Sequence, residues 1–165
     1  MLIEELEGFG KRKVADLRES YAEWVLLDGF SAAVAEAIAS GDDILQYNAG
    51  PLFSHHIDQG GIFSESDWEF ILDGLDGNMH WTCALAICRT LAEHPELLEI
   101  DLVAFSAFLH EKANASTSFL RAWAISAFWE LGKMYSDYED EAKAYREQGL
   151  KDTAKCVVVR MQKLV

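Results

Sequence analysis

The sequence lacks the short motifs that build common catalytic sites. It contains no GxSxG, no Walker A loop and no GxGxxG, so acyl transfer, nucleotide hydrolysis and dinucleotide binding find no local support. HExxH and CxxC are also missing, which removes the usual zinc-binding spacings. No motif therefore predicts an enzyme, and we expect no cofactor.

Cysteine is scarce and long apolar runs are absent. The three cysteines are an odd number, which argues against a disulfide framework, and we expect them as small buried residues. Residues 1–10 are acidic where a secretory signal would be basic and then apolar. We therefore expect a cytoplasmic protein without a membrane span.

Positive charge is also scarce. The 14 Lys and Arg stand against 28 Asp and Glu, so the net charge is −14. Such a field repels polyanions, which makes nucleic acid and anionic membrane surfaces poor partners. We expect another protein as the partner, and the charge would suit a basic one.

One phrase recurs loosely three times toward the C-terminus. The copies span residues 80–91, 120–131 and 153–164, at offsets of 40 and 33 residues. Offsets of this size are typical of arrays in which one helical hairpin stacks on the next. No alternating strand pattern competes, so the sequence predicts an all-α fold.

The N-terminal segment is predicted to contain helices followed by an irregular loop. Apolar periodicity predicts a helix over residues 11–27, ended by Gly29, a second that begins at an N-cap of Ser31, and a short third over residues 43–47. Residues 48–61 contain three glycines and a proline. We interpret them as either a functional loop or a connector.

The rest of the chain is predicted to alternate first and second helices of hairpins. Capping boxes are predicted at Ser66 to Glu69 and at Ser136 to Glu139. The remaining boundaries are a turn at residues 76–78, a helix over 80–93, a start near Asp101, a helix over 119–133, a C-cap at Gly149 and a last helix opened by Asp152.

The segment Leu120 to Gly132 resembles the second helix of a HEAT repeat. The match lies at Arg121, Ala124, Ala127, Leu131 and Gly132. The turn before Arg121 departs from the pattern, because it carries serine and threonine where these repeats usually place Asp.

The resemblance implies a fold and a class of function. The fold would be a short right-handed α-solenoid of HEAT or armadillo-like type, with about three hairpins over residues 62–165. A helical cap and loop over residues 1–61 would precede it, and we expect one compact domain overall. HEAT arrays are usually curved binding scaffolds whose second helices line a concave face.

That register predicts a partner-binding stripe. Arg89, Trp129 and Gln162 occupy equivalent positions in the three copies, and Lys133 lies one turn beyond Trp129. Trp and Arg often carry binding energy in interfaces. The alternative is that Trp129 packs under a neighbouring loop or helix.

The other positions of the middle copy predict its core and its open end. Trp123 and Leu131 lie on the apolar row and are expected to be buried. Ala122 and Ser126 share the row of Trp129, and Thr82 and Ala86 lie on the equivalent row of the preceding copy. These small side chains are expected to leave one end of the face open.

His55, His56 and Asp58 are the best candidates for chemistry. Two imidazoles and a carboxylate in a glycine-rich loop could bind a metal or share a proton. Adjacent histidines in an extended loop point in opposite directions, however, so loop and capping contacts are the favoured interpretation. The other three histidines are isolated and are expected to make ordinary structural contacts.

Three functions remain open at this stage. The first is a non-catalytic protein-binding module or scaffold that uses the second-helix face. The second is an acidic antagonist or immunity-type protein that caps a basic partner. The third is an enzyme, or an accessory similar to the HEAT-like proteins that attach or remove bilin chromophores, with its site at His55 to Asp58.

Overall fold

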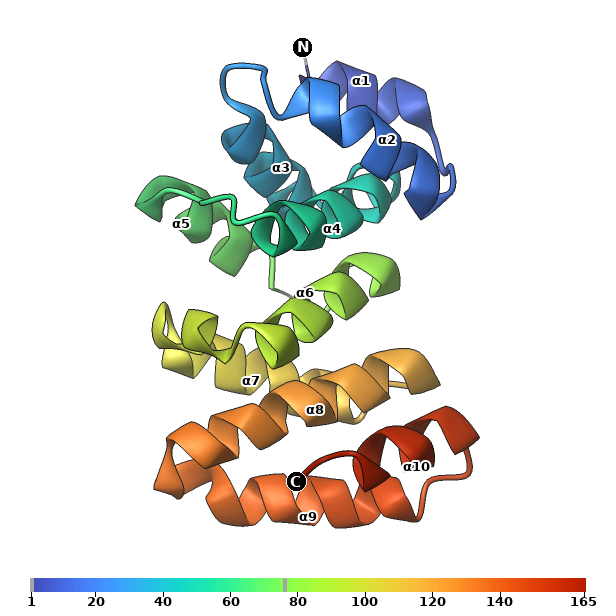
Figure 1. Ribbon diagram of the computed structural model, residues 1–165, viewed down its shortest axis with the longest axis vertical. Coiled ribbons are helices and arrows are strands. Elements are labelled where there is room, and N and C mark those ends of the chain that lie inside the picture. Colours follow the sequence, from blue (N-terminus) through green and yellow to red (C-terminus); the bar gives the residue numbers. More distant parts are fainter. Residues whose placement is uncertain (1, 76) are drawn as a thin grey trace. The chain divides into compact units, whose positions relative to one another are not determined.

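The computed structural model describes residues 2–75 and 77–165, and helices joined by short connections make up these ranges (Figure 1). They contain ten α-helices, two short 3-10 turns and no strand, which confirms the predicted all-α class. No helix in the described ranges is both long enough and apolar enough to cross a bilayer. Asp76, placed by the sequence in a turn, lies outside those ranges.

The contacts divide the chain into two compact units, Met1–Ile87 and Cys88–Val165. Helix α6 (Trp81–Glu93) continues through the boundary between them. The predicted division after residue 61 falls inside the first unit. That division, and a single compact domain overall, remain predictions.

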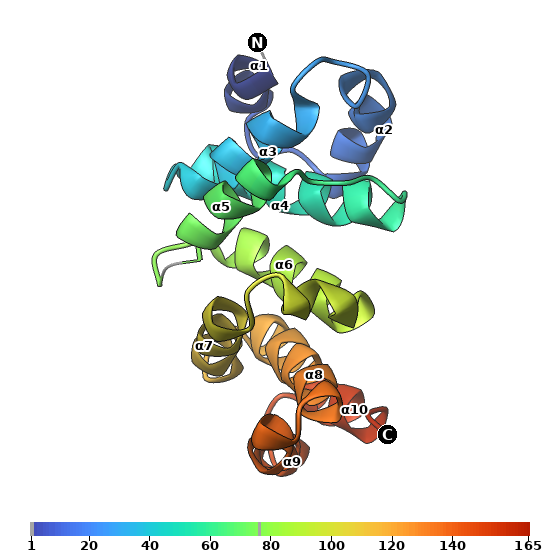
Figure 2. The same cartoon turned by 90° about the vertical axis from the view of Figure 1, so that its left-hand side faces the viewer.

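Helix α4 is the centre of the first unit. It packs against α1, α2 and α3, and α3 also packs against α5 (Figures 1 and 2). Helix α2 is shorter than the predicted 11–27. The bounds are α1 Leu2–Phe9, α2 Val14–Trp24, α3 Phe30–Ala39, α4 Asp43–Asp58 and α5 Glu65–Asp73.

The predicted loop over residues 48–61 is wrong for most of its length. Helix α4 begins where the short third helix was predicted, because the Asp42 carboxylate accepts hydrogen bonds from the backbone N–H groups two and three residues further on (2.9 Å each). It does not end at residue 47 but continues to Asp58. Only the residues after Asp58 remain irregular before α5.

Tertiary packing explains why Gly50 and Pro51, two residues that usually interrupt helices, lie inside α4. A Cβ on Gly50 would lie 2.7 Å from the Cα of Cys83, so glycine allows the first half of α6 to approach α4 closely. Pro51 removes one backbone donor, which costs about 3 kcal/mol in a typical helix interior. Leu52 and Phe53 are fully buried beside it and offset that cost, at about 1.5–3 kcal/mol each.

Two predicted helix starts in the first unit are displaced. Gly29, predicted to end a helix, is the N-cap of α3 with a left-handed φ of 80°, and Ser31 lies inside that helix. The capping box of α5 is formed by Ser64 and Asp67, not by Ser66 and its partner. The Asp67 N–H donates to the hydroxyl of Ser64 (3.2 Å), and the Ser64 N–H donates to the Asp67 carboxylate (2.8 Å).

Helix α8 is the centre of the second unit. It packs against α7, α9 and α10, and α9 also packs against α10 (Figure 2). Leu131 is fully buried, as predicted. The bounds are η1 Pro95–Glu99, α7 Leu102–Ala113, α8 Ser118–Met134, η2 Ser136–Tyr138, α9 Glu139–Leu150 and α10 Lys155–Gln162.

The predicted helix ends of the second unit are partly correct. Asp101 is the N-cap of α7, as expected, and accepts a hydrogen bond from the Ala104 N–H (2.9 Å). The predicted capping box at Ser136 is wrong, because Ser136 begins a 3-10 turn and α9 starts without a side-chain cap. Gly149 is not a C-cap but a buried residue of α9, where a Cβ would lie 2.6 Å from the Cγ of Met161.

Arg121 joins α8 to the two turns beside it. Its guanidinium donates two hydrogen bonds to the carboxylate of Asp152 (2.8 and 2.9 Å), which lies between α9 and α10. It also donates to the backbone carbonyls of Ala115 and Ser116 (2.7 and 3.0 Å). The hydrogen bonds between Arg121 and Asp152 raise the pKa of the guanidinium and lower that of the carboxylate, so the pair stays charged.

Replacing Gly50 by alanine is expected to destabilise the first unit by about 1–3 kcal/mol, because the new methyl group would collide with the backbone of α6 at Cys83. Gly8→Ala in α1 is the matched control, since a Cβ at Gly8 meets nothing within 4 Å. The control should be neutral or stabilising by up to about 1 kcal/mol. Urea denaturation measures both, and equal stabilities of the two variants would contradict the close contact.

Candidate functional site

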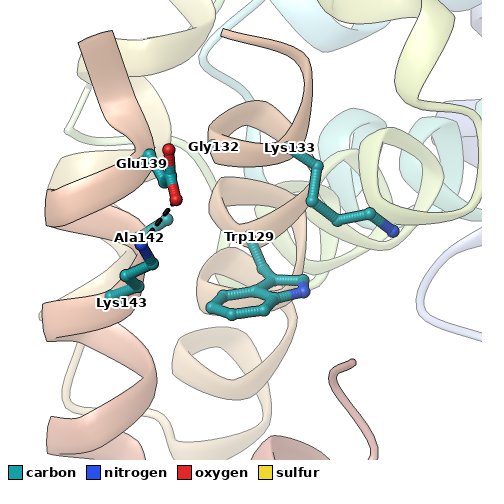
Figure 3. A pocket seen from close by; sticks show the side chains of 6 residues that line it. All are labelled: Trp129, Gly132, Lys133, Glu139, Ala142 and Lys143. Carbon is teal, nitrogen blue, oxygen red and sulfur yellow. Dashed lines mark hydrogen bonds and ion pairs between the residues drawn. The ribbon is translucent and has the colours of Figure 1, made fainter. Parts of the chain in front are cut away.

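A hollow of about 460 Å³ lies between α8 and α9 in the second unit. Its volume is within the roughly 300–1,000 Å³ that is usual for ligand pockets. Figure 3 shows the side chains around it, with the indole of Trp129 on α8 facing the gap toward α9. The lining residues are Trp129, Gly132 and Lys133 from α8 and Glu139, Ala142 and Lys143 from α9.

Gly132 brings the two helices together beside the hollow. A Cβ on Gly132 would lie 2.5 Å from the Cβ of Ala142 and 3.2 Å from the carbonyl oxygen of Tyr138. The helices approach closely here because neither carries a larger side chain at the contact. The larger side chain of Trp129, one turn away, then stands next to the contact and forms a wall of the hollow.

Trp129 is half-buried and fixed by two contacts. The guanidinium of Arg146, from α9, lies 5.4 Å from the centroid of the indole, within the range of a cation–π interaction. The Nε1–H donates to the backbone oxygen of Val165 (3.3 Å). An indole that is already ordered loses little further entropy on binding a partner.

Charges of both signs surround the hollow. Lys133 forms an ion pair with Glu130 (3.1 Å), and Lys143 pairs with Glu139. The hydrogen bond from Lys143 lowers the pKa of Glu139 and raises that of Lys143. Lys133, Glu139 and Lys143 are solvent-exposed, so the pairing orients these side chains more than it stabilises the fold.

The structure brings together part of the predicted stripe. Trp129 and Lys133 line the same hollow. Arg89 pairs with Glu93 in α6 (3.1 Å), and Gln162 is exposed at the end of α10, but the lining of the hollow includes neither. A continuous stripe through Arg89 and Gln162 therefore stays a prediction.

The predicted open end of this face is wrong at Ala122 and Ser126, because both are buried. The Nε–H of Arg160 in α10 donates to the Ser126 hydroxyl (2.8 Å). Trp123 is half-buried rather than a core residue, and the same guanidinium lies 3.3 Å from its ring centroid. Burial lowers the pKa of Arg160. The stacking on Trp123 and the hydrogen bond to Ser126 compensate for the hydration that the guanidinium loses.

The residues of the predicted histidine site lie in a helix and not in a loop. His55, His56 and Asp58 occupy the last turn of α4, so the two imidazoles diverge around the helix rather than alternate along a loop. His55 packs edge-on against Tyr21, and Asp58 is exposed. Among the described residues, no group of three or more His, Cys, Asp or Glu side chains could hold a metal ion.

His56 is a buried structural residue. Its Nδ1 accepts a hydrogen bond from the Tyr21 hydroxyl (2.9 Å), and its Nε2 lies 3.4 Å from the backbone oxygen of Ile62. These contacts fit the neutral tautomer with a proton on Nε2. Gly61 is required beside the ring, since a Cβ there would lie 2.2 Å from Cε1. Burial lowers the pKa of His56.

A further hollow, which the sequence did not predict, lies in the first unit. It has a volume of about 500 Å³ and is lined by the turn between α2 and α3, by His56 and by Ile62. Leu26 and Ile62 lie on it and are each 82% exposed. The sequence signal that could have predicted this surface is the run Val25-Leu-Leu before Asp28-Gly. Three consecutive apolar residues at a helix end cannot all face the same core, so at least one of them is expected at the surface.

The two buried cysteines are not activated for chemistry. Cys83 and Cys88 are fully buried, as predicted, whereas Cys156 is half-buried. Burial raises the pKa of the Cys83 thiol to about 12 and raises that of Cys88 as well. A thiol acts as a nucleophile only in its deprotonated form, so neither buried cysteine suits catalysis.

Comparisons with protein-family models, with curated proteins and with solved structures found no match. The likeness to HEAT repeats therefore rests on the residues of this chain alone.

Acidification is expected to destabilise the first unit through His56. Its pKa is depressed from the ordinary value of 6.5 by burial, so the unfolded chain binds more protons once the pH falls below about 6.5. The free energy of unfolding should decrease as the pH falls from there through the folded-state pKa, and this histidine should contribute no slope above that window. Burial also lowers the pKa of His80, which adds a contribution of the same sign.

Urea denaturation of the wild type and of His56→Gln across this pH window tests the effect. Glutamine offers a donor and an acceptor but does not titrate, so the variant should show a shallower pH dependence. Equal slopes for the two proteins would contradict the assignment of a neutral buried His56.

Proposed function

We propose that this protein is a non-catalytic protein-binding module that uses the face of α8 beside α9. The observation that carries the proposal is Trp129, a half-buried indole on a hollow of about 460 Å³. Tryptophan is enriched among residues that dominate binding energy. Lys133 and Lys143 at the rim could hydrogen-bond to the backbone or carboxylates of a peptide, while the indole contacts an apolar side chain.

We also propose that the helices form a short right-handed α-solenoid of HEAT or armadillo-like type. The pairing of Arg121 with Asp152 supports this. Asp152 lies in the turn before α10, the place where HEAT repeats usually carry Asp. Arg121 occupies the position of the arginine in the HEAT pattern, so the pair would link one hairpin to the next.

Binding is favoured over catalysis by the state of the candidate groups. The Nδ1 of His56 accepts a hydrogen bond from Tyr21, and its Nε2 faces the backbone oxygen of Ile62. The ring is also buried, so it is poorly placed to accept a proton from a substrate. We therefore do not place an enzymatic or chromophore-lyase-like site at His55 to Asp58.

Trp129→Ala is expected to weaken partner binding by roughly 2 kcal/mol or more. It should cost less stability than Leu131→Ala, which removes a fully buried side chain and should cost about 2–5 kcal/mol. The partner is first identified by quantitative mass spectrometry of the proteins that the wild type captures from a lysate of the native host. The affinity of each variant for that partner is then measured. Denaturation midpoints are measured for each variant.

Trp123→Ala is the matched control, because Trp123 lies on the same helix but does not line the hollow. A partner retained by Trp123→Ala and lost by Trp129→Ala supports the proposal. A partner lost equally with both variants, or a Trp129→Ala protein as unstable as Leu131→Ala, counts against it.

A further inference from the structure

Two of the most exposed apolar side chains of the first unit converge on one hollow. Leu26 follows α2 and Ile62 precedes α5, and each is 82% exposed. Both line the same space of about 500 Å³, together with Val25, Leu27 and Phe30. Single exposed apolar residues are common on protein surfaces, but a contiguous group around a concavity is typical of an interaction site.

Hydrogen bonds fix both edges of this hollow. Around Leu26, the Leu26 N–H donates to the backbone carbonyl of Glu23 (3.3 Å), and the Leu27 N–H donates to that of Trp24 (2.9 Å). On the other edge, His56 contacts the backbone oxygen of Ile62 while its second nitrogen binds Tyr21 of α2. The exposed side chains thus stand on an ordered backbone, and a partner would bind to a surface that is already formed.

The unit that carries this surface is strongly acidic. Residues 1–87 contain 16 Asp and Glu but 4 Lys and Arg, whereas residues 88–165 contain 12 and 10, so the net charges are −12 and −2. No Lys or Arg occurs between Arg18 and Arg89. Asp28 lines the hollow itself. The acidity of the protein is therefore concentrated in the unit that carries Leu26 and Ile62.

We propose that this hollow docks an amphipathic, lysine- and arginine-rich segment of a partner protein. Apolar side chains of the segment would cover Leu26 and Ile62, while its cations would face Asp28 and the net negative charge of this unit. Complementary charge would speed association and fix orientation. The proposal rests on the proposed role in protein binding, but it uses a surface separate from the hollow at Trp129.

The test uses a fluorescein-labelled synthetic peptide designed as an amphipathic helix of leucine and lysine. A twin peptide carries glutamate in place of lysine. Fluorescence anisotropy of the full chain with each peptide, at increasing ionic strength, reports affinity and its electrostatic part. The basic peptide should bind, its affinity should fall with salt, and the acidic twin should bind at least tenfold more weakly.

Matched variants locate the binding surface. Leu26→Ser combined with Ile62→Ser should weaken binding of the basic peptide about tenfold or more, and Asp28→Asn should weaken it several-fold. Val103→Ser is the control for loss of an exposed apolar residue, since Val103 is 76% exposed on α7. Asp140→Asn on α9 is the control for loss of an exposed charge. Because all these side chains are exposed or lie at a rim, circular dichroism should show unchanged folding.

Several outcomes separate this proposal from the proposed role of Trp129. Loss of peptide binding in the Leu26/Ile62 variant but not in Trp129→Ala supports it, whatever role Trp129 has. Loss in Trp129→Ala alone overturns it and leaves the hollow at Trp129 as the binding site. It is also overturned if the controls weaken binding equally, or if light scattering shows that the wild type self-associates through Leu26 and Ile62 and the variant does not.

Discussion

Close contact between helices at small residues is the constraint on which the described packing depends. Gly50 admits the backbone of α6 at Cys83, Gly132 admits Ala142 of α9, and Gly149 admits Met161 of α10. Each contact lets two helices approach without a void, and dispersion contacts accumulate along the pair. The same constraint shapes the surface. Beside the contact of Gly132 with Ala142, the larger side chain of Trp129 lines the hollow that we propose as a binding site.

The two candidate surfaces differ in their chemistry. The hollow at Trp129 has an ordered indole and paired charges of both signs, which suits a polar peptide with one apolar anchor. The hollow at Leu26 and Ile62 carries two exposed apolar side chains beside Asp28 in a strongly acidic unit, which suits a basic amphipathic segment. If both are used, a single chain could hold two different partners, which is the usual task of a scaffold.

The sequence suggested a metal-binding or catalytic role for His55 and His56, whereas the structure gives His56 a buried structural role. A neutral imidazole between Tyr21 and the backbone of Ile62 joins α2 to the segment before α5. The ring therefore has a positioning role, because it contacts both Tyr21 of α2 and Ile62 at the edge of the hollow. Among the groups that the sequence singled out for chemistry, His56 is thus occupied by structural contacts.

The sequence by itself determined the helical class, the cap at Asp101, the extent of α8 and the burial of Leu131, Cys83 and Cys88. These features depend on local hydrogen bonds and on apolar periodicity, which neighbouring residues encode. Only the tertiary structure decided that Gly50 and Pro51 continue a helix, that Arg160 binds Ser126 and stacks on Trp123, and that Leu26 and Ile62 line one hollow. Each of these depends on a contact between residues far apart in the chain, so the free energy that decides them is absent from any local pattern.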